Sequence, residues 1–161
     1  MSPDLGILVI RMLLGIVMFM HGAQKLLGWF GGYGFNGTAL FLEELGFRPG
    51  VGFAAAVGLS ELGGGVLLIF GLFTPFGAAA VLVSMLLAIA STQIKNRFLT
   101  IATELELPLI YAVSAVGIAF TGGGAFSLDA FLGYKWFEQL FVVDGALTLA
   151  VIAIAAAVLR R

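Results

Sequence analysis

Four polar side chains interrupt an apolar stretch, Leu5 to Leu27, that is long enough to cross a bilayer as a helix. They are Arg11, His21, Gln24 and Lys25. An ionisable group near the centre of such a helix costs at least ~2.5–3.5 kcal/mol, so intramembrane charges usually face a bundle interior and serve a function. This stretch therefore predicts a polar site inside a membrane protein.

The three basic residues of this stretch share one face of the predicted helix. At about 100° per residue, Arg11, His21 and Lys25 fall within a sector of about 80°. His21 and Lys25 are one turn apart, whereas Arg11 lies about 15 Å further along the axis. Basic groups on one such face need acidic partners or an anionic, electron-rich ligand.

Glu61 is the natural acidic partner, because it is the only ionisable residue between Arg48 and Lys95. It lies near the middle of a second apolar stretch. The residues around it are small: Gly58, Ser60, Gly63, Gly64 and Gly65. Small residues let another helix approach closely and leave space beside the carboxylate. The sequence leaves open which of the three basic residues pairs with Glu61.

His21, Lys25 and Glu61 have the chemistry that a membrane quinone requires. Reduction of a quinone needs hydrogen bonds to its carbonyl oxygens and protons for the resulting hydroquinone, and these side chains supply both. The unperturbed pKa of histidine, about 6.5, suits proton transfer. We predict these three residues as catalytic and Arg11 as a further quinone-binding residue. The alternative is a buried ion pair that only fixes helix register, with a histidine that only hydrogen-bonds to a neighbour.

Two further residues are candidates for the quinone site. Glu106 directly precedes Leu107-Pro108 and is expected to face the bundle interior. Glu104, two residues earlier, points to another face and is expected to be an exposed acid at a helix start. Trp29 belongs to an aromatic group after the first stretch, which forms either an interfacial belt or the mouth of a pocket for a flat ring.

The elements that must position these residues are all helical. Five apolar stretches are expected to cross the membrane: Leu5–Leu27, Val51–Phe70, Phe76–Gln93, Leu105–Phe120 and Phe141–Leu159. A short interfacial helix capped by Thr38 is predicted over Thr38 to Leu45. We therefore expect an all-α integral-membrane helix bundle, with a four-helix core and a fifth C-terminal transmembrane helix, forming a single domain over residues 1–161.

The composition agrees with a membrane protein. Hydrophobic residues make up 61% of the 161 residues and charged residues only 11%, about half the share in soluble domains. A net charge of −1 gives no electrostatic case for nucleic acid. With no cysteine and one histidine, we expect no iron–sulfur cluster, haem or metal site within this chain. Electrons would then come from a partner.

Basic residues predict how the chain is oriented in the membrane. Those expected on one side of a five-span chain, or at its membrane edge, are Lys25, Arg48, Lys95, Arg97, Arg160 and Arg161. Only Lys135 falls in a loop on the other side. This asymmetry predicts an outside N-terminus and a cytoplasmic C-terminus, and it largely disappears if the last segment lies on the membrane surface.

Several short motifs follow one another in a recognisable order. They are Arg11 with His21-Gly22-x-x-Lys25, then Glu61-x-Gly63-Gly64 with Gly71 and Thr74, then Asn96, then Glu106-Leu107-Pro108-Leu109, and last Gly122-Gly123-Gly124-Ala-Phe-Ser127-Leu128-Asp129. Over roughly residues 5–130 the chain resembles the DoxX family of small integral-membrane proteins. The last motif usually reads Gly-Pro-Gly in that family, so Gly123 is a departure that affects loop stiffness.

The resemblance implies a fold and a setting. It implies a core of four membrane helices over residues 5–130, with residues 131–161 as a C-terminal extension that carries the fifth helix. It also implies a bacterial or archaeal plasma membrane. Some members are subunits of thiosulfate:quinone oxidoreductases, so the resemblance implies a membrane component of a redox system, although the substrate does not carry over.

Two functions of different classes follow. The first is a quinone-interacting subunit of an oxidoreductase system, with Arg11, His21, Lys25 and Glu61 as its polar site and Glu106 second in line. Its partners would be the lipid bilayer and a redox protein or second subunit. The second is a non-enzymatic scaffold or small-molecule carrier whose buried charges are structural or line a solute path. Either is compatible with a homo-oligomer.

Overall fold

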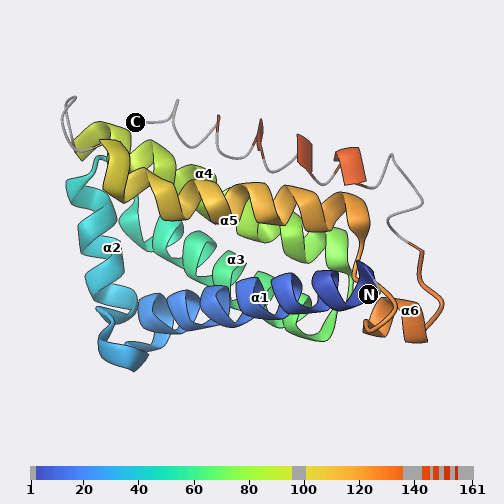
Figure 1. Ribbon diagram of the computed structural model, residues 1–161. Coiled ribbons are helices and arrows are strands. Elements are labelled where there is room, and N and C mark those ends of the chain that lie inside the picture. Colours follow the sequence, from blue (N-terminus) through green and yellow to red (C-terminus); the bar gives the residue numbers. More distant parts are fainter. Residues whose placement is uncertain are drawn as a thin grey trace.

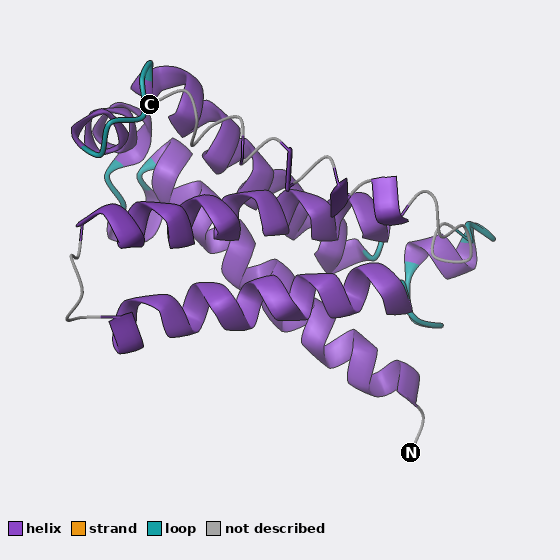
Figure 2. Ribbon diagram, turned by 90° about the horizontal axis from the view of Figure 1, so that it is seen from above, coloured by secondary structure: helices purple, strands orange, loops and turns teal. Residues whose placement is uncertain are grey.

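In the computed structural model, the described secondary structure is helical (Figure 2). The described residues are 3–95, 101–135, 143–145, 147–148, 151–152 and 155. In chain order the elements are α1 (Pro3–Leu27), the 3₁₀ turn η1 (Trp29–Gly31), α2 (Gly34–Glu44), α3 (Gly50–Phe70), α4 (Thr74–Lys95), α5 (Ile101–Thr121) and α6 (Leu128–Phe131).

The long helices have the length and composition of membrane helices. The helix α1, the helix α3 and the segment Thr74–Ser91 of α4 are long and apolar enough to span a bilayer, and Leu105–Thr121 of α5 is a shorter apolar helix. Large apolar side chains such as Leu13 and Val113 point outward and are 60% and 70% exposed, as lipid-facing residues are. The prediction of an all-α integral-membrane helix bundle is confirmed.

The long helices pack around one apolar core. The helix α3 packs against α1 and α4, and α5 packs against α4 and α1 (Figure 1). Met18, Leu68, Val81 and Ala115 are fully buried at the centre of this core. The helix α2 runs across the end of the bundle at which α1 ends and α3 begins (Figure 1). The helix α6 lies at the opposite end, near the start of α1.

The register between α1 and α3 is set by direct backbone contact. A Cβ atom added to Gly22 would lie 2.4 Å from the backbone nitrogen of Leu62, and one added to Gly65 would lie 2.5 Å from that of Phe19. Small residues at such crossings allow the backbones to touch. This register brings the last turns of α1 beside the middle of α3.

Most predicted helices match those of the structure, with two exceptions. The short helix begins at Gly34 rather than Thr38. The prediction that Thr38 caps it is wrong, because the Thr38 hydroxyl instead donates a hydrogen bond to the Lys25 carbonyl oxygen at 3.2 Å. The predicted fifth span, Phe141–Leu159, lies largely outside the described residues, so it stays a prediction. Among its described residues, Val143 is buried in the main core.

Candidate functional site

An ion pair joins α1 and α3 inside the bundle. The Lys25 Nζ atom lies 2.5 Å from the Glu61 Oε2 atom. The Glu61 side chain is 2% exposed and that of Lys25 is 30% exposed. Of the three basic residues that the sequence offered, Lys25 is therefore the one that pairs with Glu61. The pair joins a buried carboxylate to a lysine side chain that is partly exposed.

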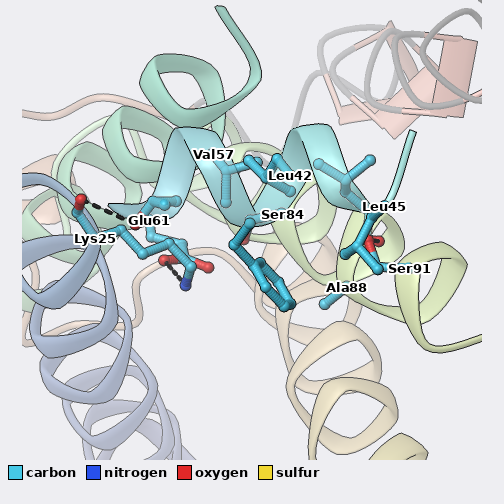
Figure 3. A pocket seen from close by; sticks show the side chains of 11 residues that line it. Lys25, Leu42, Leu45, Val57, Glu61, Ser84, Ala88 and Ser91 are labelled. Atoms are coloured by element: carbon cyan, nitrogen blue, oxygen red, sulfur yellow. Dashed lines mark hydrogen bonds and ion pairs between the residues drawn. The ribbon is translucent and has the colours of Figure 1, made fainter. Parts of the chain in front are cut away.

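The ion pair forms one end of a cavity of about 250 Å³, which we call the Glu61 cavity. Residues from α1 to α4 line it: Lys25, Thr38, Phe41, Leu42, Leu45, Val57, Glu61, Ser84, Leu87, Ala88 and Ser91. Lys25 and Glu61 lie together at one end, and Leu45, Ala88 and Ser91 lie at the other (Figure 3). Apolar side chains predominate between them.

Such an arrangement suits an apolar ligand that carries a hydrogen-bond acceptor. Binding sites for small molecules are concave and mostly apolar, with a few polar groups that fix orientation. A lysine ammonium has three N–H donors, and one of them is directed at Glu61. The ammonium thus has the chemistry to bind a carbonyl oxygen at this end of the cavity, while the carboxylate holds it in place.

Three polar residues of the cavity were missed by the sequence prediction: Ser84, Thr38 and Ser91. Ser84 is an isolated hydroxyl in an apolar helix, it is 1% exposed, and its Oγ donates to the Val81 carbonyl oxygen at 2.9 Å. Thr38 contributes a second hydroxyl to the wall. A lone serine within an apolar stretch was a signal for Ser84. No sequence signal placed Thr38 against Lys25.

His21 lies beside this site but is not among the described residues that line the cavity. Its side chain is half-buried and interacts with those of Gln24 and Lys25. The structure thus brings Lys25 and Glu61 together at the cavity and places His21 on the neighbouring turn of α1. The catalytic role of His21 stays a prediction.

Arg11 lies in a different region from the ion pair. Its guanidinium donates to the carbonyl oxygens of Leu68 and Ile69 in the last turn of α3, the latter at 2.9 Å, and to that of Phe126 at 2.9 Å. The side chain is 1% exposed. The structure therefore separates Arg11 from Lys25 and Glu61, with which the sequence had grouped it.

A buried carboxylate completes this second region. Asp129 is 3% exposed and accepts hydrogen bonds from the backbone nitrogens of Phe73 and Thr74, at 2.8 and 2.9 Å, and from the Thr74 hydroxyl at 2.7 Å. Gly71, at φ 62°, ends α3, and its carbonyl oxygen accepts from the Asp129 backbone nitrogen. Arg11 and Asp129 thus fasten the α3–α4 turn and α6, and we call this group the Arg11–Asp129 cluster.

Glu106 and Trp29 both lie on the surface. The expectation that Glu106 faces the bundle interior is wrong, because its side chain is exposed on α5. Trp29 is 53% exposed, packs edge-on against Phe30 and is not among the described residues that line the Glu61 cavity. The side chain of Glu104 lies outside the described part of the chain. The described residues hold no group of three or more His, Cys, Asp or Glu side chains that could bind a metal ion.

The comparisons with known proteins agree with the membrane architecture. The chain is 29% identical over 131 residues to "Putative oxidoreductase CatD" of Bacillus subtilis (strain 168), a match that covers 81% of this chain and 90% of that protein. It is 28% identical over 135 residues to "Inner membrane protein YqjF" of Escherichia coli (strain K12), covering 83% and 96%. No solved structure matches the chain.

The family comparison covers the helices that build the site. The DoxX family model matches residues 6–94, which is more than half of the chain and includes both Lys25 and Glu61. The motifs that we compared with the family beyond residue 94, Asp129 among them, lie outside the matched range. The resemblance noted from the sequence is confirmed, and the chain is an integral membrane protein that belongs to the DoxX family.

Proposed function

We propose that this protein is the membrane component of a quinone-linked redox system, and that the Glu61 cavity binds the quinone ring. One observation carries the proposal. A mainly apolar cavity of about 250 Å³, built from α1 to α4, ends at the Lys25–Glu61 ion pair. A quinone ring is flat and apolar with carbonyl oxygens as hydrogen-bond acceptors, so it matches both parts of this cavity.

Each side chain at the polar end has a separate task in this proposal. The Lys25 ammonium donates a hydrogen bond to a quinone carbonyl oxygen. Glu61 holds the ammonium at the cavity wall and stabilises its charge in a region of low dielectric. A bound quinone accepts two electrons and two protons to give the hydroquinone. We expect the electrons to come from a partner protein, because the chain has no cysteine and a single histidine.

The name of one relative supports a redox role. One of the two matched proteins is named a putative oxidoreductase and the other an inner membrane protein.

We further propose that the end of the bundle that carries α2 faces the cytoplasm. Lys25, Arg48 and Lys95 all lie at that end of the helices, as the positive-inside rule requires.

The proposal is tested by the quinone content of the purified protein. The tagged protein is extracted from native membranes in mild detergent, and quinone per chain is measured by mass spectrometry. We expect near-stoichiometric quinone in the wild type and in the exposed-residue control Glu106→Gln, and quinone at the lipid background in the double variant Lys25→Met/Glu61→Gln. Quinone retained by the double variant, or absent from the wild type, contradicts the proposal.

A scaffold or carrier role has one observation in its favour. Lys25 and Glu61 neutralise each other at 2.5 Å, as a pair that only fixes helix register would. In that case Glu61→Gln lowers the thermal stability of the protein and changes no ligand binding. If the Glu61 cavity is a binding site, the same variant loses ligand and keeps its fold.

A further inference from the structure

A second cavity, of about 320 Å³, adjoins the Glu61 cavity at Lys25, and we call it the Tyr33 cavity. It is lined by Gln24, Lys25, Gly31, Gly32, Tyr33, Thr38 and Phe41. Lys25, Thr38 and Phe41 line both cavities. The two spaces therefore share a wall, and Lys25 is its charged member.

The residues at the edges of the two cavities differ. The Tyr33 cavity lies among the backbone and polar side chains of the α1–α2 connection, and Tyr33 at its rim is 87% exposed. Gln24 fastens this connection by donating a hydrogen bond to the Phe30 carbonyl oxygen at 3.4 Å. In the Glu61 cavity, by contrast, the carboxylate is 2% exposed. Lys25 lines the Tyr33 cavity and reaches the buried Glu61 carboxylate.

At the opposite end of the bundle, the polar side chains of the Arg11–Asp129 cluster are almost completely buried. There Arg11, Thr74 and Asp129 are 1%, 0% and 3% exposed, and they hydrogen-bond to the backbone or to one another. A cavity bordered by Lys25, Gln24, Tyr33 and Thr38 thus lies at the α2 end, and a buried polar cluster lies at the α6 end. This difference between the two ends favours access of water to the ion pair from the α2 end.

We infer that the Tyr33 cavity is a water route that supplies protons to the Glu61 cavity from the α2 face of the membrane alone, with Lys25 as the barrier between them. In the transfer step, an N–H bond of the Lys25 ammonium breaks and an O–H bond forms on the acceptor in the Glu61 cavity. The lysine amine then takes a proton from a water molecule in the Tyr33 cavity, and that water is restored by a proton relayed from hydronium in the bulk solution at the α2 face. No electron moves in this step, and Glu61 remains a carboxylate that stabilises the restored ammonium.

Single cysteines introduced into this cysteine-free chain test the route. Tyr33→Cys marks the rim, Thr38→Cys the shared wall and Ser84→Cys the far side of Lys25. Phe131→Cys, at a residue that is 85% exposed in α6, marks the opposite face. Each variant is treated in sealed vesicles with a membrane-impermeant methanethiosulfonate, applied to one face at a time. Ser114→Cys, in an apolar groove between α1 and α5, is the lipid-facing control.

We expect Thr38→Cys to react from the same face as Tyr33→Cys and never from the face that labels Phe131→Cys. Ser84→Cys is expected to react at least tenfold faster when it is combined with Lys25→Ala/Glu61→Gln than with the ion pair intact. Labelling of Thr38→Cys from the opposite face or from neither, or a Ser84→Cys rate that changes less than tenfold, overturns the inference. Should the triple variant aggregate, Thr38→Cys decides alone, because it leaves both charges in place.

The inference rests on the proposed function only for the identity of the proton acceptor. Thiol labelling needs no quinone, so the water route and the quinone site fail in different experiments. One-sided labelling in a protein that contains no quinone would support the water route and contradict the quinone site. Stoichiometric quinone together with labelling of Thr38→Cys from the opposite face would support the quinone site and contradict the water route.

Discussion

The two groups of buried charges in this protein are alike in residue type and opposite in surroundings. The Arg11–Asp129 cluster is densely hydrogen-bonded, since both terminal nitrogens of the guanidinium donate to backbone carbonyl oxygens, with only its Nε unpaired among the described atoms, and the Asp129 carboxylate accepts three hydrogen bonds. The Lys25–Glu61 pair has few partners and borders a cavity of about 250 Å³. Buried charge alone therefore does not identify a functional site. A buried charge that borders a cavity is a better indicator of a binding site than a buried charge alone.

This contrast assigns separate roles to the two groups. The Arg11–Asp129 cluster joins the end of α3, the start of α4 and α6, so its loss would affect the fold. The Lys25–Glu61 pair contacts two helices that the Gly22–Leu62 backbone contact already holds together, so its loss would affect a ligand more than the fold. Variants in each group can break or sharpen this distinction.

The largest effect is expected from Arg11→Ala. The substitution removes the hydrogen bonds that Arg11 donates to three carbonyl oxygens, and it leaves Asp129 without a nearby positive charge. Removing one partner of a buried charged network typically costs about 3–5 kcal/mol. Thermal unfolding in detergent should show a much lower Tm and a lower yield, whereas the exposed control Arg48→Ala should match the wild type. A wild-type Tm for Arg11→Ala would mean that the cluster does not hold the fold.

Glu61→Gln should reduce ligand binding while leaving the fold intact. The change removes the charge that holds the Lys25 ammonium, and the Lys25 side chain, which is 30% exposed, is not left fully buried. A hydrogen bond to a charged group contributes about 1.5–3 kcal/mol, so quinone affinity should fall roughly 10- to 100-fold. A titration with a short-chain quinone measures this. Unchanged affinity together with a lower Tm would favour the scaffold function.

Ala88→Phe should block the Glu61 cavity without changing any charge. Ala88 lies at the end of the cavity away from the ion pair (Figure 3), and a phenyl ring there occupies the space of a ligand. Quinone occupancy should fall several-fold while the Tm stays near that of the wild type. Val113→Phe, on the exposed face of α5, is the control for added bulk. Full occupancy in Ala88→Phe would place the ligand elsewhere.

His21→Ala should have the smallest effect on binding. His21 is not among the described residues that line the Glu61 cavity, so quinone affinity should change less than about twofold. If His21 takes part in proton transfer through Lys25, quinone-linked turnover should fall although affinity does not. Parallel binding and turnover measurements separate these two effects. A loss of quinone affinity as large as that of Glu61→Gln would contradict this prediction and indicate that His21 contacts the ligand.

The helices could be predicted closely from the sequence, because bilayer thickness fixes the length of an apolar stretch. The predicted Val51–Phe70 and Leu5–Leu27 became α3 and α1 with shifts of one and two residues at their starts. The turn after α3 also fits its residues, since Gly71 adopts a left-handed conformation. Thr38 was misplaced because its hydroxyl bonds to a residue 13 positions away rather than to its own helix.

The site could be predicted only in part. Helical periodicity placed Arg11, His21 and Lys25 on one face, but it gives no information on the depth at which α3 crosses α1. That depth depends on the close contact at Gly22, which pairs Glu61 with Lys25 and leaves Arg11 opposite the end of α3. Ser84 and Thr38 meet at the cavity only after α2 and α4 have packed around it.

Photoaffinity mapping with a short-chain azidoquinone is the measurement that tests the central claim most directly. The purified protein is irradiated with the probe, and the attached residues are identified by peptide mass spectrometry, with and without excess unlabelled quinone. We predict competable attachment to residues of the Glu61 cavity on α2, α3 and α4, and its loss in Ala88→Phe. Competable attachment confined to the α1–α5 groove around Tyr111, or attachment that excess quinone does not suppress, would contradict the account.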